Sequence, residues 1–108
     1  MKINSRIVYH GAGRKPSLHI RKSDRDLYFS PSNKRIIIEI DGTKYYTTLT
    51  NDFFGNVMQI RKIYEKPDTV TANMLLEWVE TNNLKVGDEV QLEVVKKNKY
   101  FKLSKMGS

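Results

Sequence analysis

The sequence of 108 residues is 39% hydrophobic, contains no cysteine and carries a net charge of +7. This length suits one domain with a thin core, and the lack of cysteine excludes a disulfide scaffold and cysteine-based zinc or redox sites, in keeping with a reducing, cytoplasmic setting. No run of ~18 apolar residues is present for a membrane span, and no signal peptide opens the chain. We expect a single domain over residues 1–106, because Gly107-Ser108 resembles a cloning remnant.

The charge is unevenly distributed along the chain. Residues 1–35 carry nine basic and two acidic side chains, residues 36–93 carry five basic and ten acidic ones, and residues 94–108 carry five lysines and no acid. If the two basic ends lie side by side in the fold, one face of the molecule is strongly positive and attracts polyanions. The pattern favours nucleic acid as the partner, with an acidic membrane surface as the less favoured alternative.

Turn-forming residues divide the chain into short β-type segments. Stretches rich in β-branched and aromatic residues predict strands at residues 3–9, 18–21, 34–40, 43–50, 57–64, 89–94 and 100–103. In the first of them, Ile3, Ile7 and Tyr9 are predicted to share a face, whereas residues 24–29 have no clear pattern. About seven strands and one main helix favour a partly closed barrel, because closing a sheet removes its exposed edges.

The clearest local signal is a hairpin at residues 34–50. Asp41-Gly42 lies between two strand-like flanks, and this dipeptide favours a type I′ turn, in which both central residues have positive φ. Since successive side chains of a strand point to opposite faces, Ile36, Ile38 and Ile40 are predicted to lie in the core.

A helix is predicted to follow Asp68, Thr69 or Thr71 as its cap and to end near Asn82. Met74, Leu75, Trp78 and Val79 recur at helical spacing, so they define one apolar face. We therefore interpret Trp78 as a core residue rather than as a platform on which a base stacks.

The sequence contains no familiar catalytic or metal-binding motif. Its histidines, His10 and His19, do not have the spacing of a zinc site, and Gly11-Ala12-Gly13 is too short for a dinucleotide fingerprint. No lysine has an acidic residue two positions before it, as a Mg²⁺-dependent nuclease site would require. We predict a protein that is not itself an enzyme and that needs no metal and no cofactor.

Two polar loops are candidates for recognition: residues 10–17 and residues 51–59. Both combine glycine with amide and charged side chains. Arginine and lysine can hydrogen-bond guanine in the major groove, and asparagine and glutamine can hydrogen-bond adenine there. On composition alone, however, an ordinary surface turn is the simpler interpretation of either loop.

A resemblance favours the functional interpretation. The stretch from Leu76 to Leu92, with its Asn82-x-Leu84-x-x-Gly87-Asp88 corner between a helix and a strand, resembles the DNA-binding pseudobarrel family. That family covers the plant B-three transcription-factor domains and the specificity domains of some restriction endonucleases, and the order of predicted elements also resembles it. The implied fold class is mainly β with one or two helices, as an open seven-stranded pseudobarrel.

The resemblance implies sequence-specific binding of double-stranded DNA, with two loops on the same side of the barrel gripping the major groove. The implied setting is the target-recognition module of a restriction endonuclease, with a fused or partner nuclease domain. Carried over to this chain, the base contacts are His10, Arg14, Lys15, Ser17, Asn51, Asp52, Asn56 and Gln59. The phosphate contacts are Arg6, Arg21, Lys22, Lys34, Lys44 and Arg61.

Other readings stay open. The stretch from Leu84 to Val90 also resembles the swapped-hairpin barrels of bacterial transition-state regulators. An RNA- or single-strand-binding barrel would stack bases on exposed aromatic side chains, for which Tyr45, Tyr46 and Tyr100 are candidates. A small nuclease or toxin is disfavoured by the missing acid-x-Lys triplet.

Overall fold

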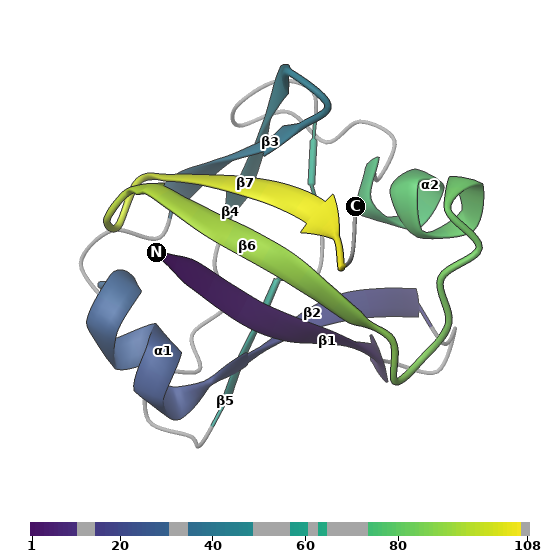
Figure 1. The fold of residues 1–108 in the computed structure, drawn as a ribbon, viewed down its shortest axis with the longest axis horizontal. Coiled ribbons are helices and arrows are strands. Elements are labelled where there is room, and N and C mark those ends of the chain that lie inside the picture. Colours follow the sequence, from purple (N-terminus) through teal and green to yellow (C-terminus); the bar gives the residue numbers. More distant parts are fainter. Residues whose placement is uncertain (11–14, 31–34, 49–56, 61–62, 65–73, 107–108) are drawn as a thin grey trace.

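The computed structural model describes residues 1–10, 15–30, 35–48, 57–60, 63–64 and 74–106 (Figure 1). The elements in chain order are β1 (Lys2–His10), β2 (Lys15–Arg21), α1 (Lys22–Tyr28), β3 (Arg35–Ile40), β4 (Thr43–Thr48), β5 (Val57–Ile60), α2 (Met74–Thr81), β6 (Glu89–Lys96) and β7 (Tyr100–Lys105). The two helices have seven and eight residues, and no described helix is long and apolar enough to cross a membrane.

All the strands belong to one strongly curled, open sheet with the order β4-β3-β7-β6-β1-β2-β5 (Figure 1). Neighbouring strands are antiparallel except β3 and β7, which run parallel. The two edges of the sheet meet at one point, where Tyr46 of β4 and Tyr64, beyond the end of β5, exchange two backbone hydrogen bonds of 2.7 Å. The predicted class, mainly β with one or two helices around an open barrel-like sheet, is confirmed.

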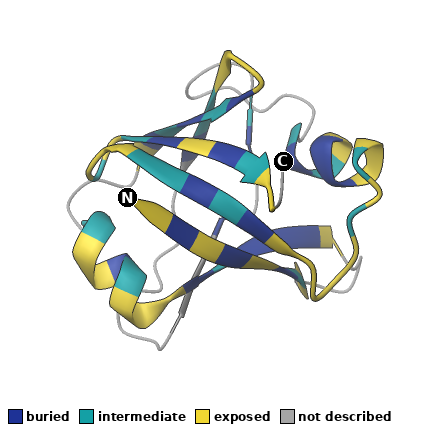
Figure 2. Cartoon of the chain, viewed as in Figure 1, coloured by how far each residue is buried: buried dark blue, intermediate teal, exposed yellow. Residues whose placement is uncertain are grey.

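The core fills the inside of this curled sheet. Buried and exposed positions alternate along the strands (Figure 2), as expected for a sheet with one apolar face. Ile36, Ile38 and Ile40 are buried, as the hairpin predicted. Helix α2 packs against β2 and buries Leu75, Trp78 and Val79 in the same core, which confirms its apolar face.

Several tight turns of the described chain depend on left-handed backbone conformations. Asp41 and Gly42 have φ of 51° and 83°, so the predicted type I′ hairpin is confirmed. Helix α2 ends with Asn83 at φ 53°, where the Leu84 N–H donates to the Val79 carbonyl at 3.0 Å, the pattern of a Schellman motif. Gly87, at φ 94°, donates its N–H to the Ile7 carbonyl at 2.8 Å and so fixes the corner to β1.

The structure differs from the sequence-based expectations at several places. Residues 22–28 form helix α1, although the sequence there has no clear pattern. The expected strand 57–64 is regular only over β5, with Tyr64 in an isolated bridge. Tyr9 is 52% exposed, because it lies near the end of β1, beyond the part of the core that buries Ile3 and Ile7. The beginning of the predicted helix lies outside the described residues.

Candidate nucleic-acid interface

One end of the barrel gathers exposed cations from five elements. The strand registers place the beginnings of β1, β3 and β7 beside the ends of β2 and β6. This basic end consists of the exposed side chains of Lys2, Arg21, Lys22, Arg35, Lys96, Lys97 and Lys99. It lies at the left of Figure 1, where the N-terminus, α1 and the β6–β7 turn are close together.

The two basic segments of the sequence meet at this end. The Val94 N–H donates to the Met1 carbonyl at 2.8 Å, and the Asn98 N–H donates to the Tyr28 carbonyl at 2.9 Å. The first bond joins the N-terminus to β6, and the second joins the β6–β7 turn to the end of α1. Lys2, Arg21, Lys22 and Arg35 of the first basic segment thereby lie at the same end as Lys96, Lys97 and Lys99 of the last one.

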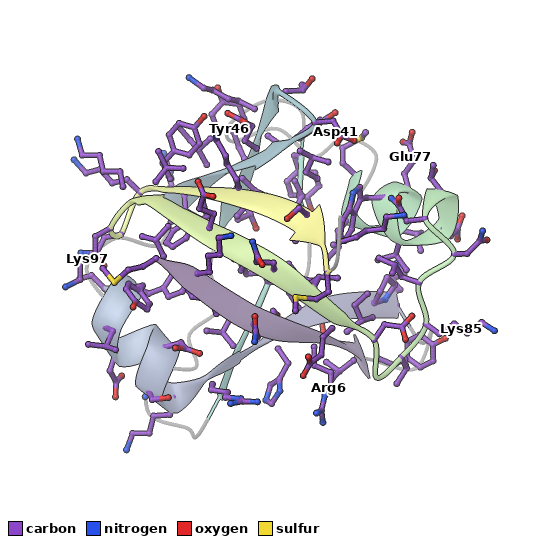
Figure 3. The ribbon with its side chains drawn as sticks, viewed as in Figure 1. Arg6, Asp41, Tyr46, Glu77, Lys85 and Lys97 are labelled. Atoms are coloured by element: carbon purple, nitrogen blue, oxygen red, sulfur yellow. The ribbon has the colours of Figure 1, made fainter. Side chains whose placement is uncertain are left out.

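Acidic side chains gather at the opposite end of the molecule, around α2 and the β3–β4 turn (Figure 3). Asp41 and Glu77 line a pocket of about 260 Å³ whose apolar wall includes Trp78. Asp88 and Glu89 lie at the beginning of β6, at the same end of the sheet as the β1–β2 turn. A polyanion is therefore attracted to the basic end and repelled from the pocket that Asp41 and Glu77 line.

A third surface, the β1–β2 polar face, lies on the outside of these two strands. It is formed by Asn4, Arg6, His19 and Arg21, which line a shallow pocket of about 70 Å³ together with Ser5 and Glu89. Arg6 lies opposite His19 on β2 and opposite Glu89 on β6. The Ser5 hydroxyl donates to the His19 carbonyl at 2.9 Å, which connects the two strands at this position.

Charge is balanced elsewhere on the outer surface of the sheet. The registers place Lys44, Glu39, Lys102, Glu93 and Lys2 in one row of alternating sign across β4, β3, β7, β6 and β1. The Lys102 Nζ lies 3.8 Å from the Glu39 Oε2. This row is a charge ladder of the kind that stabilises neighbouring strands, and each of its cations lies opposite a carboxylate.

Tyr100 is tied to the same ladder. Its hydroxyl donates a hydrogen bond to Glu39, and the Lys44 Nζ lies 5.3 Å from the centre of its ring. The hydrogen bond to Glu39 raises the pKa of Tyr100, and desolvation and the negative charge of the carboxylate act in the same direction. Lys44, a predicted phosphate contact, therefore already interacts with Tyr100 and lies opposite Glu39.

The predicted phosphate contacts that the structure describes are all exposed. Arg6 and Arg21 belong to the β1–β2 polar face, Lys22 follows them at the beginning of α1, and Lys44 lies in the charge ladder. The structure thus brings three of these four residues to β1, β2 and the beginning of α1. The other predicted phosphate contacts, Lys34 and Arg61, lie outside the described residues.

Half of the eight predicted base contacts belong to segments that the structure does not describe. Those outside the described residues are Arg14, Asn51, Asp52 and Asn56, and His10 and Gln59 are described only by their backbone. Lys15 is exposed at the beginning of β2. Ser17 is fully buried and already has an interaction partner, so its side chain does not reach the surface and its prediction as a base contact needs correction.

The two predicted arms are anchored at opposite ends of β2, so the expectation that both loops lie on the same side of the barrel is wrong. His10 pairs with Lys15 beside the first arm, whereas Val57, which follows residues 51–56 of the second arm, pairs with Arg21. Six residue steps of about 3.3 Å separate Lys15 from Arg21, so the two anchor points are about 20 Å apart. Because β2 is antiparallel to both β1 and β5, the end of β1 and the beginning of β5 lie at its two ends, and Val57 lies at the basic end beside Arg21.

Sequence reasoning missed the cations of the β6–β7 turn. Lys96, Lys97 and Lys99 are exposed, and Arg35 lies close to them because β3 runs parallel to β7. The positive charge of residues 94–108 was visible in the sequence. The position of Arg35 beside these lysines could not be predicted, because it depends on the parallel pairing of β3 with β7, two strands that are far apart in the chain.

Other candidate chemistry is limited in the described part of the chain. No group of three or more His, Asp or Glu side chains there is arranged to hold a metal ion. Among the aromatic candidates for base stacking, Tyr45 packs against the core, and Tyr46 and Tyr100 are partly exposed.

Comparison with known proteins gives a family without an assigned activity. A sequence model described as a family of unknown function (DUF7112) matches residues 2–108. No curated protein and no solved structure matches the chain. The function must therefore be inferred from the geometry of this chain.

Proposed function

The chain belongs to the DUF7112 family, and we propose that it is a double-stranded DNA-binding domain that contacts DNA with its β1–β2 polar face. The observation that carries the proposal is the position of Arg6, His19 and Arg21, which line one shallow pocket on exposed antiparallel strands. Lys22, at the beginning of α1, extends this surface toward the basic end.

The chemistry of the face suits a duplex. A two-stranded β-ribbon fits the major groove of B-DNA, and β1 and β2 form such a ribbon from Ile7 to His10 and from Lys15 to Ser17, beyond the residues that also pair with β6 and β5. Arg6 and His19 lie directly beside this ribbon, in the wider sheet. Arginine binds both phosphate oxygens and the guanine edge through its planar guanidinium group. Glu89 lies opposite Arg6 and offsets part of its charge, so Arg21 and Lys22 are the stronger candidates for phosphate contacts.

On this proposal the loops at the two ends of β2 supply further base contacts. Their anchor points on β2 lie about 20 Å apart along a strand that rises about 3.3 Å per residue, so on this proposal the two loops contact separate stretches of the duplex and do not close on the same point of the groove. We further propose that the domain is the recognition module of a restriction endonuclease, with a fused or partner nuclease domain. This setting is supported by the resemblance alone.

Fluorescence anisotropy titrations test the proposal. Labelled duplex and single-stranded DNA of equal length are titrated at several salt concentrations with the unmodified protein and with Arg21→Ala. We expect the duplex to bind more tightly, and we expect Arg21→Ala to lower the slope of log K against log salt by about 1, the effect of losing one phosphate contact.

Lys85→Ala is the matched control, because Lys85 is equally exposed but precedes β6 at the opposite end of the molecule. It should leave the affinity for the duplex nearly unchanged. Tighter binding of the single strand would instead support the barrel that stacks bases on aromatic residues. Equal effects of Arg21→Ala and Lys85→Ala would contradict the assignment of the β1–β2 polar face.

A further inference from the structure

We infer that the β6–β7 turn, with Lys96, Lys97 and Lys99, is a second docking site for the phosphate backbone of the same DNA duplex. The inference rests on the proposed function and extends it to residues that neither the sequence motifs nor the family assigns. Its role is sequence-independent: the turn holds the backbone while the β1–β2 polar face reads the groove.

The turn is held rigidly in the fold. Asn98 adopts a left-handed conformation with φ 66°, and the Lys99 N–H donates to the Lys96 carbonyl at 3.0 Å. The Asn98 N–H bonds to Tyr28 of α1 at 2.9 Å, and the Lys99 carbonyl accepts the Ile37 N–H of β3 at 2.8 Å. A backbone fixed on two sides adds little to the ordering cost of binding, which then comes from the lysine side chains alone.

The charges around the turn favour an anionic partner. Three exposed lysines, Lys96, Lys97 and Lys99, lie within four residues of the chain, so like charges are close together in the turn. Three nearby carboxylates face cations or a phenol: Glu39 interacts with Tyr100 and Lys102, Asp26 pairs with Arg25 at 3.1 Å, and Glu93 lies opposite Lys2 and Lys102. Bringing a phosphate chain to this end relieves the repulsion and releases condensed counterions from the DNA.

Lysine is suited to this role. Its ammonium group is a flexible point charge that binds phosphate without a fixed geometry, whereas arginine favours planar, bidentate recognition. The β6–β7 turn carries only lysines at its exposed basic positions, and the β1–β2 polar face carries arginines. Backbone contacts position a protein on DNA, and base contacts give specificity, so the two surfaces divide these tasks.

One duplex can reach both surfaces. Helix α1 connects them, since it begins at Lys22 beside Arg21 and ends at Tyr28, whose carbonyl holds Asn98 of the turn. Seven residues at 1.5 Å per residue span about 10 Å. Phosphates follow one another every 3.4 Å along the axis of each strand, so this span corresponds to roughly three phosphates. Asp24 and Asp26 lie on α1, so the duplex is expected to pass beside the helix.

The test compares two double variants of equal charge change. Lys97→Ala/Lys99→Ala removes cations from the turn, and Lys85→Ala/Lys105→Ala removes exposed cations from the opposite end. Each protein is titrated with several duplex sequences over a range of salt, and circular dichroism confirms that it is folded. We expect the turn variant to lower the salt slope by about 1.8, the value for two lost phosphate contacts, and to weaken all duplexes by the same factor.

Several outcomes would overturn the inference. Equal losses in both double variants would mean that only the net charge matters. Losses that differ between duplex sequences would mean that the turn reads bases. If the turn variant weakened binding to vesicles that contain phosphatidylserine but did not weaken binding to the duplex, the turn would be assigned to a membrane surface.

The outcomes for the two sites are separable. If the turn variant weakens duplex binding and Arg21→Ala does not, the docking site stands and the β1–β2 polar face is wrong. If Arg21→Ala weakens binding and the turn variant does not, the β1–β2 polar face stands and the docking site at the turn is wrong. If the unmodified protein binds no DNA at low salt, both proposals fail.

Discussion

At the scale of single residues, Tyr100 shows how the surface of the sheet is held together. It donates to Glu39, which in turn lies 3.8 Å from the Lys102 Nζ, and its ring lies under the Lys44 ammonium. These contacts connect β4, β3 and β7, which are neighbours in the sheet. Tyr100 is therefore better explained as a structural residue of the charge ladder than as a platform for a nucleic-acid base.

This hydrogen bond predicts a specific pH dependence. Because the pKa of Tyr100 is raised above its ordinary value of 10.0, the folded protein holds the phenol proton more tightly than the unfolded chain does. The stabilisation is fully present below pH 10 and is lost as the pH rises through the higher pKa of the folded state. Tyr100→Phe should therefore be less stable than the unmodified protein at pH 8, and its stability should fall less steeply between pH 10 and 11.

Urea unfolding of both proteins at several pH values measures this difference. The phenylalanine ring keeps the surface below Lys44, so the comparison isolates the hydroxyl group. Parallel stability curves for the two proteins above pH 10 would contradict the assigned hydrogen bond.

Some of the predicted DNA contacts lie at the surface and one is buried, and the difference has a physical reason. Arg6 and Arg21 were expected at the surface and are exposed there, because alternation along a strand determines which face a charged residue occupies. Ser17 has the same parity as His19 on β2 and is nevertheless fully buried. Small polar residues are compatible with either environment, so sequence pattern alone could not locate it.

At the scale of elements, local chemistry predicted the hairpin better than it predicted either helix. Asp41-Gly42 specifies its turn through φ angles that few other dipeptides adopt easily. Helix α1 has no such signal: only Arg25 is buried among its residues, and Phe29, directly after it, stacks on Phe101 at 4.7 Å. Its position depends on contacts with β2, β5 and β7, which the sequence of the helix does not contain.

The hairpin turn provides a prediction about stability. Gly42 has φ 83°, and no atom lies within 4 Å of the position where a Cβ would be added. The cost of Gly42→Ala is therefore conformational rather than steric crowding, and we expect a loss of about 1–2 kcal/mol in the free energy of unfolding. Urea unfolding should show a lower midpoint with an unchanged slope.

Gly42→Asn is the matched control for this variant. Asparagine tolerates the left-handed region better than alanine does, so its loss of stability should be clearly smaller. Equal losses for the two variants would mean that the turn is sensitive to any side chain at this position, and the conformational explanation would be wrong.

At the scale of the whole molecule, the topology places opposite charges at opposite ends. The sequence shows only that its two terminal segments are basic and its middle segment is acidic. The order β3-β7-β6-β1-β2 brings the first and last strands of the chain into the centre of the sheet. This order puts Lys2 and Lys97 at one end and leaves Asp41 and Glu77 at the other. The sequence could predict that one face is positive. It could not predict which residues form that face, because this depends on the parallel pairing of β3 with β7.

The same topology leaves one weak point in the barrel. The edge strands β4 and β5 are connected, within the described residues, only by the isolated bridge between Tyr46 and Tyr64. Ile38, by contrast, belongs to a strand paired on both sides, with β4 and with β7. Local opening in proteins begins where few neighbours hold an element, so the bridge should open without global unfolding.

Native-state hydrogen exchange tests this expectation directly. The Tyr46 and Tyr64 amides donate to each other's carbonyls at 2.7 Å, so their protection depends on the bridge. We expect both amides to exchange together and at least about tenfold faster than the Ile38 amide, which is a difference of about 1.4 kcal/mol in opening free energy. Exchange of all three amides at the rate of global unfolding would show instead that the barrel opens and closes as one unit.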